Sequence, residues 1–323
     1  MIFSKRIQAI YKMQVFMRAD DTGLVYYFSS DDFPGLHRKP YTFQATAGHR
    51  LQGNFYYYHD PIPGRLVVFD HGMGGGHRSY MREIETLAKH GYLVFAYDHT
   101  GCMESEGEGC NGFAQSLSDL DACLKALKAD EKYKDLEISV VGHSWGGFST
   151  MNISALHPEV KHQVAMSGFV SVEQIVKQSF AAGMMKFFFK DIMKLEQNAN
   201  PDYVQYNALD SLSKTNAQVL LIHSADDRAV RCDMHFDLLK SKLEGKDNIR
   251  FLKVEGRGHN PNYTEDAVRY KDSFFQQMQL LRHQKKLSKP EEKQAFIAEH
   301  DWHRMTAQDE SVWAQIFDLL DNH

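Results

Sequence analysis

Cysteine is scarce in this sequence, and long apolar runs are absent. Four cysteines occur in 323 residues, at positions 102, 110, 123 and 232, and their spacing fits neither a zinc site nor a dense disulfide framework. No apolar stretch approaches the ~18 residues that a membrane span needs, and the N-terminus has no apolar core followed by a small-residue cleavage site. We therefore expect reduced thiols, no membrane span and a cytoplasmic location.

An excess of positive charge is also missing. Lysine and arginine number 37 against 42 aspartates and glutamates, so the formal net charge is −5. Binding to the phosphates of nucleic acid usually requires a basic field, and we expect no nucleic-acid partner. The chain is 43% hydrophobic and 24% charged, which is ordinary for a soluble globular protein. Its length permits one large α/β domain with insertions or two smaller domains.

Short apolar runs alternate with longer helical or glycine-rich stretches along the chain. This alternation is typical of an α/β protein with a mostly parallel sheet and flanking helices. The first two runs, 41–47 and 51–58, are joined by a connection too short for a crossover, so we expect an antiparallel hairpin there. The other strands of an eight-stranded sheet are expected at 66–70, 92–97, 138–141, 163–166, 219–223 and 249–254.

The same pattern divides the chain into an α/β core and additions to it. The expected parts are an N-terminal extension at 1–40, the core at 41–168 and 218–282, a helical cap insertion at 169–217, and a C-terminal helical extension at 283–323. The cap is assigned because a long helical excursion between two core strands is a natural lid over a site.

Both extensions carry apolar faces. The N-terminus begins with an amphipathic helix that places Phe3, Ile7, Ile10 and Tyr11 on one side. The C-terminal extension contains two helical patterns, with N-terminal caps expected at Ser288 and Thr306. We expect the apolar residues of the tail to dock on the core or to form a contact between copies in a homo-oligomer.

The pentapeptide Gly142-His143-Ser144-Trp145-Gly146 lies directly between an expected strand and an expected helix. A G-x-S-x-G sequence in this place holds a serine nucleophile on a sharp, strained turn. A serine hydroxyl needs a general base and an acid that orients the base. Two later loops supply them, because Asp226 and Asp227 follow one strand and His259 follows the next.

A glycine-rich loop, His71-Gly72-Met73-Gly74-Gly75, follows an earlier strand. Such a loop can also cradle phosphate, but the lysine and serine or threonine of a P-loop and the spacing of a dinucleotide fingerprint are both missing. A metal site is not expected either. His300 and His303 have a helical spacing, but the sequence provides no acidic or thiol ligand to complete a site.

Together these motifs resemble the α/β-hydrolase superfamily of serine hydrolases, in its capped esterase, lipase and serine-aminopeptidase branch. The resemblance covers most of residues 41–281 and implies a catalytic triad of Ser144, Asp227 and His259. The family's D-x-x-V step selects Asp227 over Asp226. Its H-G-x-G-G loop implies an oxyanion hole formed by the backbone amides of Met73 and Trp145. No cofactor is expected.

The residues of the expected cap indicate what kind of substrate the protein binds. Met184, Phe187 and Phe188 lie on a helical stripe wide enough to line an apolar acyl pocket, although simple burial would also explain it. We therefore expect a carboxylic ester hydrolase that acts on a small-molecule ester or acyl substrate. The alternatives are an aminopeptidase or amidase, an acyltransferase with the same triad, and a non-catalytic binding protein. An aminopeptidase would need a cap acid for the substrate's amine, from among Glu173, Asp191 and Glu196.

Overall fold

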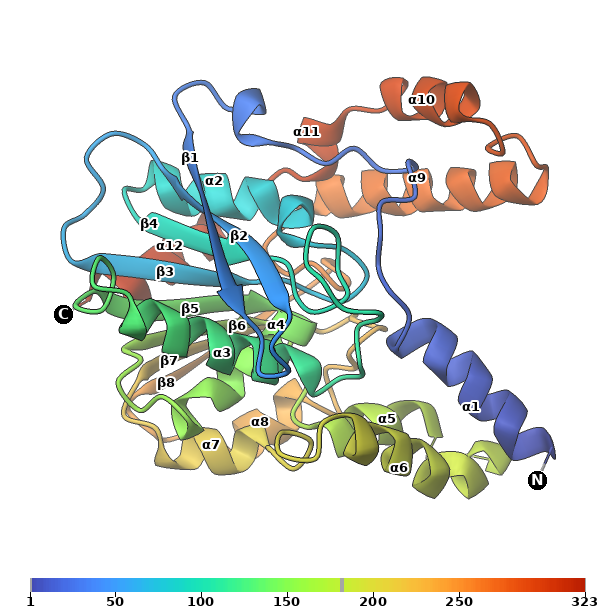
Figure 1. Cartoon of the computed structure of the whole chain (residues 1–323), viewed down its shortest axis with the longest axis horizontal. Coiled ribbons are helices and arrows are strands. Elements are labelled where there is room, and N and C mark those ends of the chain that lie inside the picture. The colour runs from blue at the N-terminus through green and yellow to red at the C-terminus, as the bar shows by residue number, and fades with distance from the viewer. Residues whose placement is uncertain (1, 181–182, 323) are drawn as a thin grey trace.

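The computed structural model describes residues 2–180 and 183–322, apart from the side chains of Ile2 and Phe3. Residues 1, 181, 182 and 323, which fall in the expected N-terminal extension, cap and C-terminal extension, lie outside the description, as does the expected apolar contact of Phe3. The fold is an α/β sandwich built on an eight-stranded sheet, shown in Figure 1. Within the described residues, no helix is both long and apolar enough to cross a bilayer.

The sheet has the strand order β1-β2-β4-β3-β5-β6-β7-β8. Strands β1 and β2, and β2 and β4, pair antiparallel, and all later pairs are parallel. The strands are β1 (His37–Gln44), β2 (Arg50–Tyr57), β3 (Arg65–Asp70), β4 (Leu93–Tyr97), β5 (Glu137–His143), β6 (His162–Met166), β7 (Gln218–Ser224) and β8 (Ile249–Val254). The expectation of a mostly parallel α/β-hydrolase sheet is therefore confirmed, including its antiparallel hairpin.

The helices connect and cover these strands. The α-helices are α1 (Ile2–Val15), α2 (Met81–Lys89), α3 (Gln115–Ala129), α4 (Trp145–Asn152), α5 (Val172–Phe180), α6 (Phe189–Ala199), α7 (Ala208–Lys214), α8 (Phe236–Leu243), α9 (Glu265–His283), α10 (Pro290–Ala298), α11 (Trp302–Met305) and α12 (Glu310–Asp321). Short 3-10 helices are η1 (Ser30–Asp32), η2 (His77–Tyr80), η3 (Ile153–Ala155) and η4 (Gly183–Phe188).

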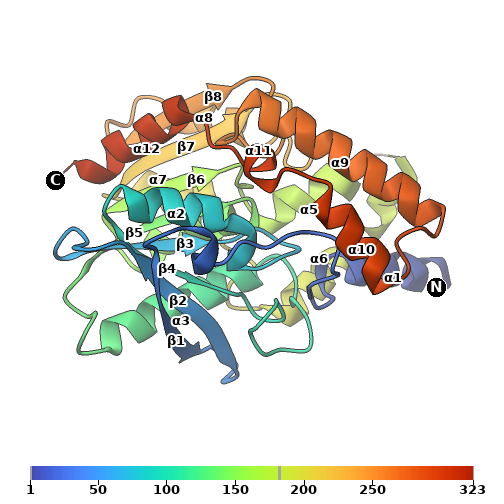
Figure 2. The ribbon, with the colours of Figure 1, turned by 90° about the horizontal axis from the view of Figure 1, so that it is seen from above.

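The side chains of β3 show that the sheet separates two hydrophobic cores, one on each of its faces. Leu66 and Val68 pack with α3 and α4, whereas Val67 and Phe69 pack with α2 and α12. Successive side chains of a strand point to opposite faces, so a strand buried on both sides must be apolar throughout. Figure 2 shows α2 and α12 above the sheet, with α3 on its other side.

The first strand differs from the expectation in its position. β1 spans residues 37–44 instead of 41–47, and it pairs with β2 from His37 opposite Tyr57 to Gln44 opposite Arg50. Most of its side chains are exposed because it is the edge strand of the sheet. The apolar pattern that reveals buried strands is therefore weak here.

Residues 169–217 form α5, η4, α6 and α7. Helices α5 and α6 pack against each other and α6 lies against α1, away from the sheet, as Figure 1 shows. Helix α7 instead packs with α4 and α8 beside the sheet. The part of this segment that projects from the sheet is thus α5 to α6, and its role as a cap stays a prediction.

The C-terminal extension docks on the core with three helices, one more than the expected pair. Its caps also differ: α10 begins after Lys289, with Pro290 first and Glu292 accepting from the Ser288 and Lys289 amides, and α12 begins after Asp309. Sequence spacing alone did not separate these arrangements, because several residues that can cap a helix stand close together here.

Helix α12 supplies a buried apolar face to the core. Trp313, Ile316 and Leu320 are almost fully buried with the β3, β6 and β7 side chains of the same cluster. Truncation of a buried isoleucine to alanine removes transfer free energy and leaves a cavity. We therefore expect Ile316→Ala to lower the free energy of unfolding by about 2–5 kcal/mol, as measured by urea denaturation.

Gln315→Ala is the matched control, since Gln315 is exposed on the same helix. It should change the free energy of unfolding by less than about 0.5 kcal/mol. Equal effects of the two substitutions would show that α12 is not part of the cooperative core.

Candidate active site

Ser144 occupies the turn between β5 and α4. Its backbone has φ 57° and ψ −109°, a conformation that non-glycine residues rarely adopt and that is held only by surrounding structure. Its amide donates to the Met166 carbonyl oxygen (2.8 Å). A Cβ on Gly142 would lie 2.2 Å from the Gly146 oxygen, and a Cβ on Gly146 would lie 2.0 Å from the Asp70 oxygen. Both glycines are therefore needed for this turn.

The structure brings Ser144, His259 and Asp227 together. His259 Nε2 lies 2.8 Å from Ser144 Oγ, and His259 Nδ1 lies 2.8 Å from Asp227 Oδ2. The three residues come from loops after β5, β8 and β7, and parallel strands bring such loops to one edge of the sheet. This is the geometry that an activated serine nucleophile requires.

Asp226 does not contact this histidine. Its carboxylate accepts from Ser224 Oγ (2.5 Å) and from the Gly258 amide (3.3 Å), and it orders the neighbouring loop. Asp227 is buried, and its Oδ1 accepts from the amides of Ala229 and Val230. Of the two adjacent aspartates, Asp227 is the one that can orient His259.

The surroundings of Asp227 keep it ionised. Burial alone would raise the pKa of its carboxyl group. Hydrogen bonds from His223 and His259, the charge of His259 and the Val230 amide outweigh burial, so the pKa lies well below its ordinary value. A carboxylate is therefore available to stabilise the imidazolium that forms when His259 takes a proton.

Met73 and Trp145, the expected oxyanion-hole residues, line the same pocket as Ser144 and His259. Trp145 is the first residue of α4, where backbone amides have no partner within the helix. The Met73 loop is held by His71, whose Nε2 accepts from the His99 amide (3.0 Å). Burial lowers the pKa of His71 to about 3, so the ring is a neutral acceptor.

A chain of hydrogen bonds joins the three loops of the site. The Gly72 amide donates to Tyr80 Oη (3.1 Å), and Tyr80 Oη lies 2.8 Å from His143 Nδ1. His143 Nε2 lies 2.6 Å from the carbonyl oxygen of His259. Burial lowers the pKa of His143 to about 3. A neutral ring that donates at Nε2 and accepts at Nδ1 satisfies both contacts.

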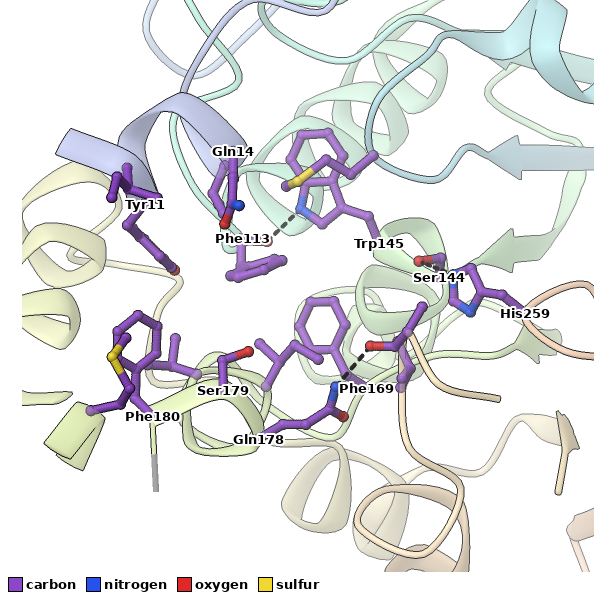
Figure 3. Close-up of a pocket in the computed structure, with 18 of the residues that line it drawn as sticks. Tyr11, Gln14, Phe113, Ser144, Trp145, Phe169, Gln178, Ser179, Phe180 and His259 are labelled. Atoms are coloured by element: carbon purple, nitrogen blue, oxygen red, sulfur yellow. Dashed lines mark hydrogen bonds between the residues drawn. The ribbon is translucent and has the colours of Figure 1, made fainter. Parts of the chain in front are cut away.

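A pocket of about 430 Å³ opens onto Ser144 and His259. Figure 3 shows Phe113, Phe169, Phe180 and Trp145 around it, with Tyr11 and Gln14 of α1 on one side. Among the described lining residues there is no aspartate or glutamate, and the polar side chains include Gln14, Gln178 and Ser179. The pocket therefore suits a mainly apolar, uncharged group.

The three residues expected to contact substrate are not among those that line this pocket. Met184 and Phe187 are each 72% exposed, and Phe188 packs against the core cluster. Met185 is the residue of this segment that lines the pocket. The expectation assumed a continuous α-helix, but residues 183–188 form a 3-10 helix, in which different residues share a face.

Sequence analysis did not assign the pocket wall that α1 provides. Ile7, Ile10, Tyr11, Gln14 and Val15 all line the pocket. The apolar face of this helix was visible in the sequence, but nothing local showed what it would cover.

A buried pair fastens α1 to α6. Tyr11 Oη donates to Glu196 Oε1 (2.6 Å), and Glu196 Oε2 accepts from the Phe113 amide (2.9 Å). Glu196 is fully buried. Burial raises the pKa of Glu196 to about 7, although both hydrogen bonds oppose the shift. Glu196 thus joins the elements that form the wall of the pocket, but its own side chain does not line the pocket.

The acid at position 227 can be tested against its neighbour. We expect Asp227→Asn to slow the labelling of Ser144 by a fluorophosphonate by a factor on the order of 10³ to 10⁴, because His259 loses the carboxylate that orients it. Asp226→Asn is the matched control and should leave the labelling rate close to wild type. The reverse ranking would assign the acid to Asp226.

The Glu196 contact predicts a pH dependence of stability. Between pH 4.5 and about 7 the folded protein keeps a proton on Glu196 that the unfolded chain releases. The free energy of unfolding should therefore fall as pH rises through this range, by up to roughly 1.4 kcal/mol per pH unit from this group, and then level off. Urea denaturation of wild type and Glu196→Gln from pH 5 to 8 measures the difference, and parallel curves would contradict it.

Comparison with known proteins agrees with this architecture. The family described as serine aminopeptidase, S33, matches residues 61–249, more than half of the chain. Among solved structures, an esterase of Pyrococcus furiosus superposes with a TM-score of 0.58 at 18% identity, covering 80% of this chain and 96% of that one. The esterase domain of a Rhodothermus marinus protein covers 72% of this chain and 94% of its own, with a TM-score of 0.51 and 19% identity.

Curated proteins match a shorter region. Monoglyceride lipase of Mus musculus is 30% identical over 116 residues, which is 35% of this chain and 36% of the lipase. Cis-3-alkyl-4-alkyloxetan-2-one decarboxylase of Shewanella oneidensis is 31% identical over 111 residues, 33% of each chain. The aligned region thus spans about a third of the length of these relatives. The chain is an α/β-hydrolase and belongs to the family described as serine aminopeptidase, S33.

Proposed function

We propose that this protein is a serine hydrolase that cleaves carboxylic esters with an apolar acyl group. The observation that carries the proposal is the pocket at Ser144, which is lined mainly by apolar side chains and, among the described residues, by no carboxylate. A neutral ester fits such a lining better than a charged substrate does.

In the proposed mechanism Ser144 is the nucleophile. His259 removes the proton from Ser144 Oγ as the oxygen attacks the ester carbonyl carbon, and Asp227 stabilises the resulting imidazolium. The amides of Met73 and Trp145 stabilise the oxyanion. His259 then protonates the leaving alcohol. A water molecule, deprotonated by His259, attacks the acyl-enzyme and releases the carboxylic acid.

Cleavage of peptides from a free amino end is the alternative that the family description favours. An aminopeptidase must pair the α-ammonium of its substrate. Glu173 forms an ion pair with Lys177 (2.5 Å), Asp191 accepts from Ser4, and Glu196 is buried against Tyr11. None of these three acids is among the residues that line the described pocket, so the ester is the favoured substrate.

The proposal is tested with a p-nitrophenyl ester series from acetyl to palmitoyl and an aminoacyl-anilide. We expect ester turnover that rises with chain length until the chain fills the pocket and then falls. Ser144→Ala should reduce kcat by a factor on the order of 10⁶, because the triad acts as a unit.

Ser179→Ala is the matched control, since Ser179 lines the same pocket without contacting His259. It should retain most of the activity. Turnover of the anilide alone would replace the esterase with a peptidase. Undiminished ester turnover by Ser144→Ala would remove Ser144 from the mechanism.

A further inference from the structure

A second cavity lies behind the glycine-rich loop, and the mechanism does not use it. Its volume is about 260 Å³. Gly72, Met73, Gly74 and Gly75 form one wall, and Met73 also lines the pocket at Ser144. Neither Ser144 nor His259 is among its lining residues. The cavity is therefore separate from the site of chemistry, although both share the Met73 loop.

The remaining walls come from the two ends of the chain and from Arg78, Ser79, Tyr80 and Arg82 of η2 and α2. Residues 25–28 of the N-terminal extension line the cavity together with residues of α9 and with Trp302, Met305 and Thr306 at α11. Figure 1 shows the blue N-terminal segment passing α11 toward α9. Leu24, Phe274, Phe296 and Met305 pack in one apolar cluster, which fixes these segments to one another. Most of this cavity thus lies outside residues 61–249, the region matched by the family.

Three basic side chains line the cavity, and among its described lining residues there is no aspartate or glutamate. Lys271 Nζ donates to Asn260 Oδ1 (2.7 Å) and lies 5.1 Å from the centre of the Tyr263 ring. Arg78 donates to the carbonyl oxygens of Tyr27 and Phe28. These hydrogen-bond partners satisfy donors, but they carry no charge.

The third basic residue, Arg82, retains an unused donor. Its nearest carboxylate oxygen, Glu85 Oε2, is 4.0 Å from Nη1, and its buried Nε has no hydrogen-bond partner in the described structure. Buried polar groups normally find a partner, and an acceptor bound in the cavity would supply one for Arg82.

Two acids outside the cavity lining, Glu83 and Asp272, lie near Lys271, and their charges act to raise its pKa. Glu83 is fully buried, and Asn262 donates to its Oε1. Burial raises the pKa of Glu83, against the opposing effects of this bond and of the Lys271 charge. Burial also lowers the pKa of Lys271. An anion in the cavity would oppose that shift.

Aromatic rings make up much of the rest of the wall. They are Tyr26, Tyr27, Phe28, Phe274, Phe275 and Trp302. Rings pack edge-to-face or offset against a further ring, and the small volume limits the ligand to about one ring with a short substituent.

We propose that this cavity binds a small aromatic monocarboxylate, with the carboxylate among Lys271, Arg78 and Arg82 and the ring among the aromatic side chains. Charged hydrogen bonds would supply recognition of the anion, and ring contacts would supply the preference for an aromatic body. The proposal does not rest on the ester hydrolase function, because the cavity shares no residue with the triad.

The test is isothermal titration of the whole protein with three ligands of the same shape: phenylacetate, 2-phenylethanol and 2-phenylethylammonium. We expect phenylacetate to bind at least tenfold more tightly than the alcohol and the ammonium compound to show no binding. Lys271→Met keeps the length of the side chain but removes its charge, and it should weaken phenylacetate binding at least tenfold.

A second variant keeps the test decisive if Lys271→Met does not fold. Phe275 is 36% exposed at the cavity, so Phe275→Glu should fold and should repel the carboxylate, again with at least a tenfold loss of affinity. Leu280→Glu is the matched control, because Leu280 is 57% exposed on the same helix and does not line the cavity. It should bind phenylacetate as wild type does.

Two results would overturn the proposal. Equal affinities for phenylacetate and 2-phenylethanol would show that the basic residues recognise no anion. Unchanged phenylacetate binding in Phe275→Glu would place the ligand elsewhere. Ser179→Trp, which fills the pocket at Ser144, should leave phenylacetate affinity unchanged, and loss of binding in this variant would assign the ligand to that pocket instead.

Discussion

The contact between the backbones of α4 and β3 is the constraint on which the site depends. Gly146 lies so close to the Asp70 carbonyl oxygen that any side chain would collide with it. A side chain on Gly142 would likewise collide with the Gly146 carbonyl oxygen. The sharp turn between these two glycines is made by Ser144, whose φ is positive. Close packing of α4 on β3 fixes the position of this turn, and the Ser144 hydroxyl lies 2.8 Å from His259 Nε2.

Burial then determines what each histidine near the site can do. His71 and His143 are buried without a carboxylate in hydrogen-bond contact, and their pKa values fall to about 3. As neutral rings they link the glycine-rich loop, the serine turn and the loop of His259. His99 is equally buried, but Asp70 and Asp119 flank it at 3.0 and 3.3 Å. Burial opposes the charge, yet the two acids prevail and raise its pKa to about 10.

Sequence analysis was most successful where short-range rules determine the structure. The strand-to-helix position of Ser144 and the loops carrying Asp227 and His259 followed from apolar runs and glycine placement, because parallel strands bring their carboxyl ends to one edge. The pocket wall did not follow from such rules. Whether Met184 or Met185 faces the cavity depends on the 3-10 geometry of residues 183–188. That α1 covers the site depends on contacts such as Tyr11 with Glu196, which are 185 residues apart in sequence.

That distant contact makes one wall of the pocket a separable part of the molecule. Five pocket residues lie within the first 15 positions, whereas Ser144, Asp227 and His259 all follow strands of the central sheet. Exchange of the terminal helix would change the shape and polarity of the pocket and leave the reacting groups where they are. Under the proposed function, substrate range could therefore change through the terminal helix while the chemistry on the sheet stays the same.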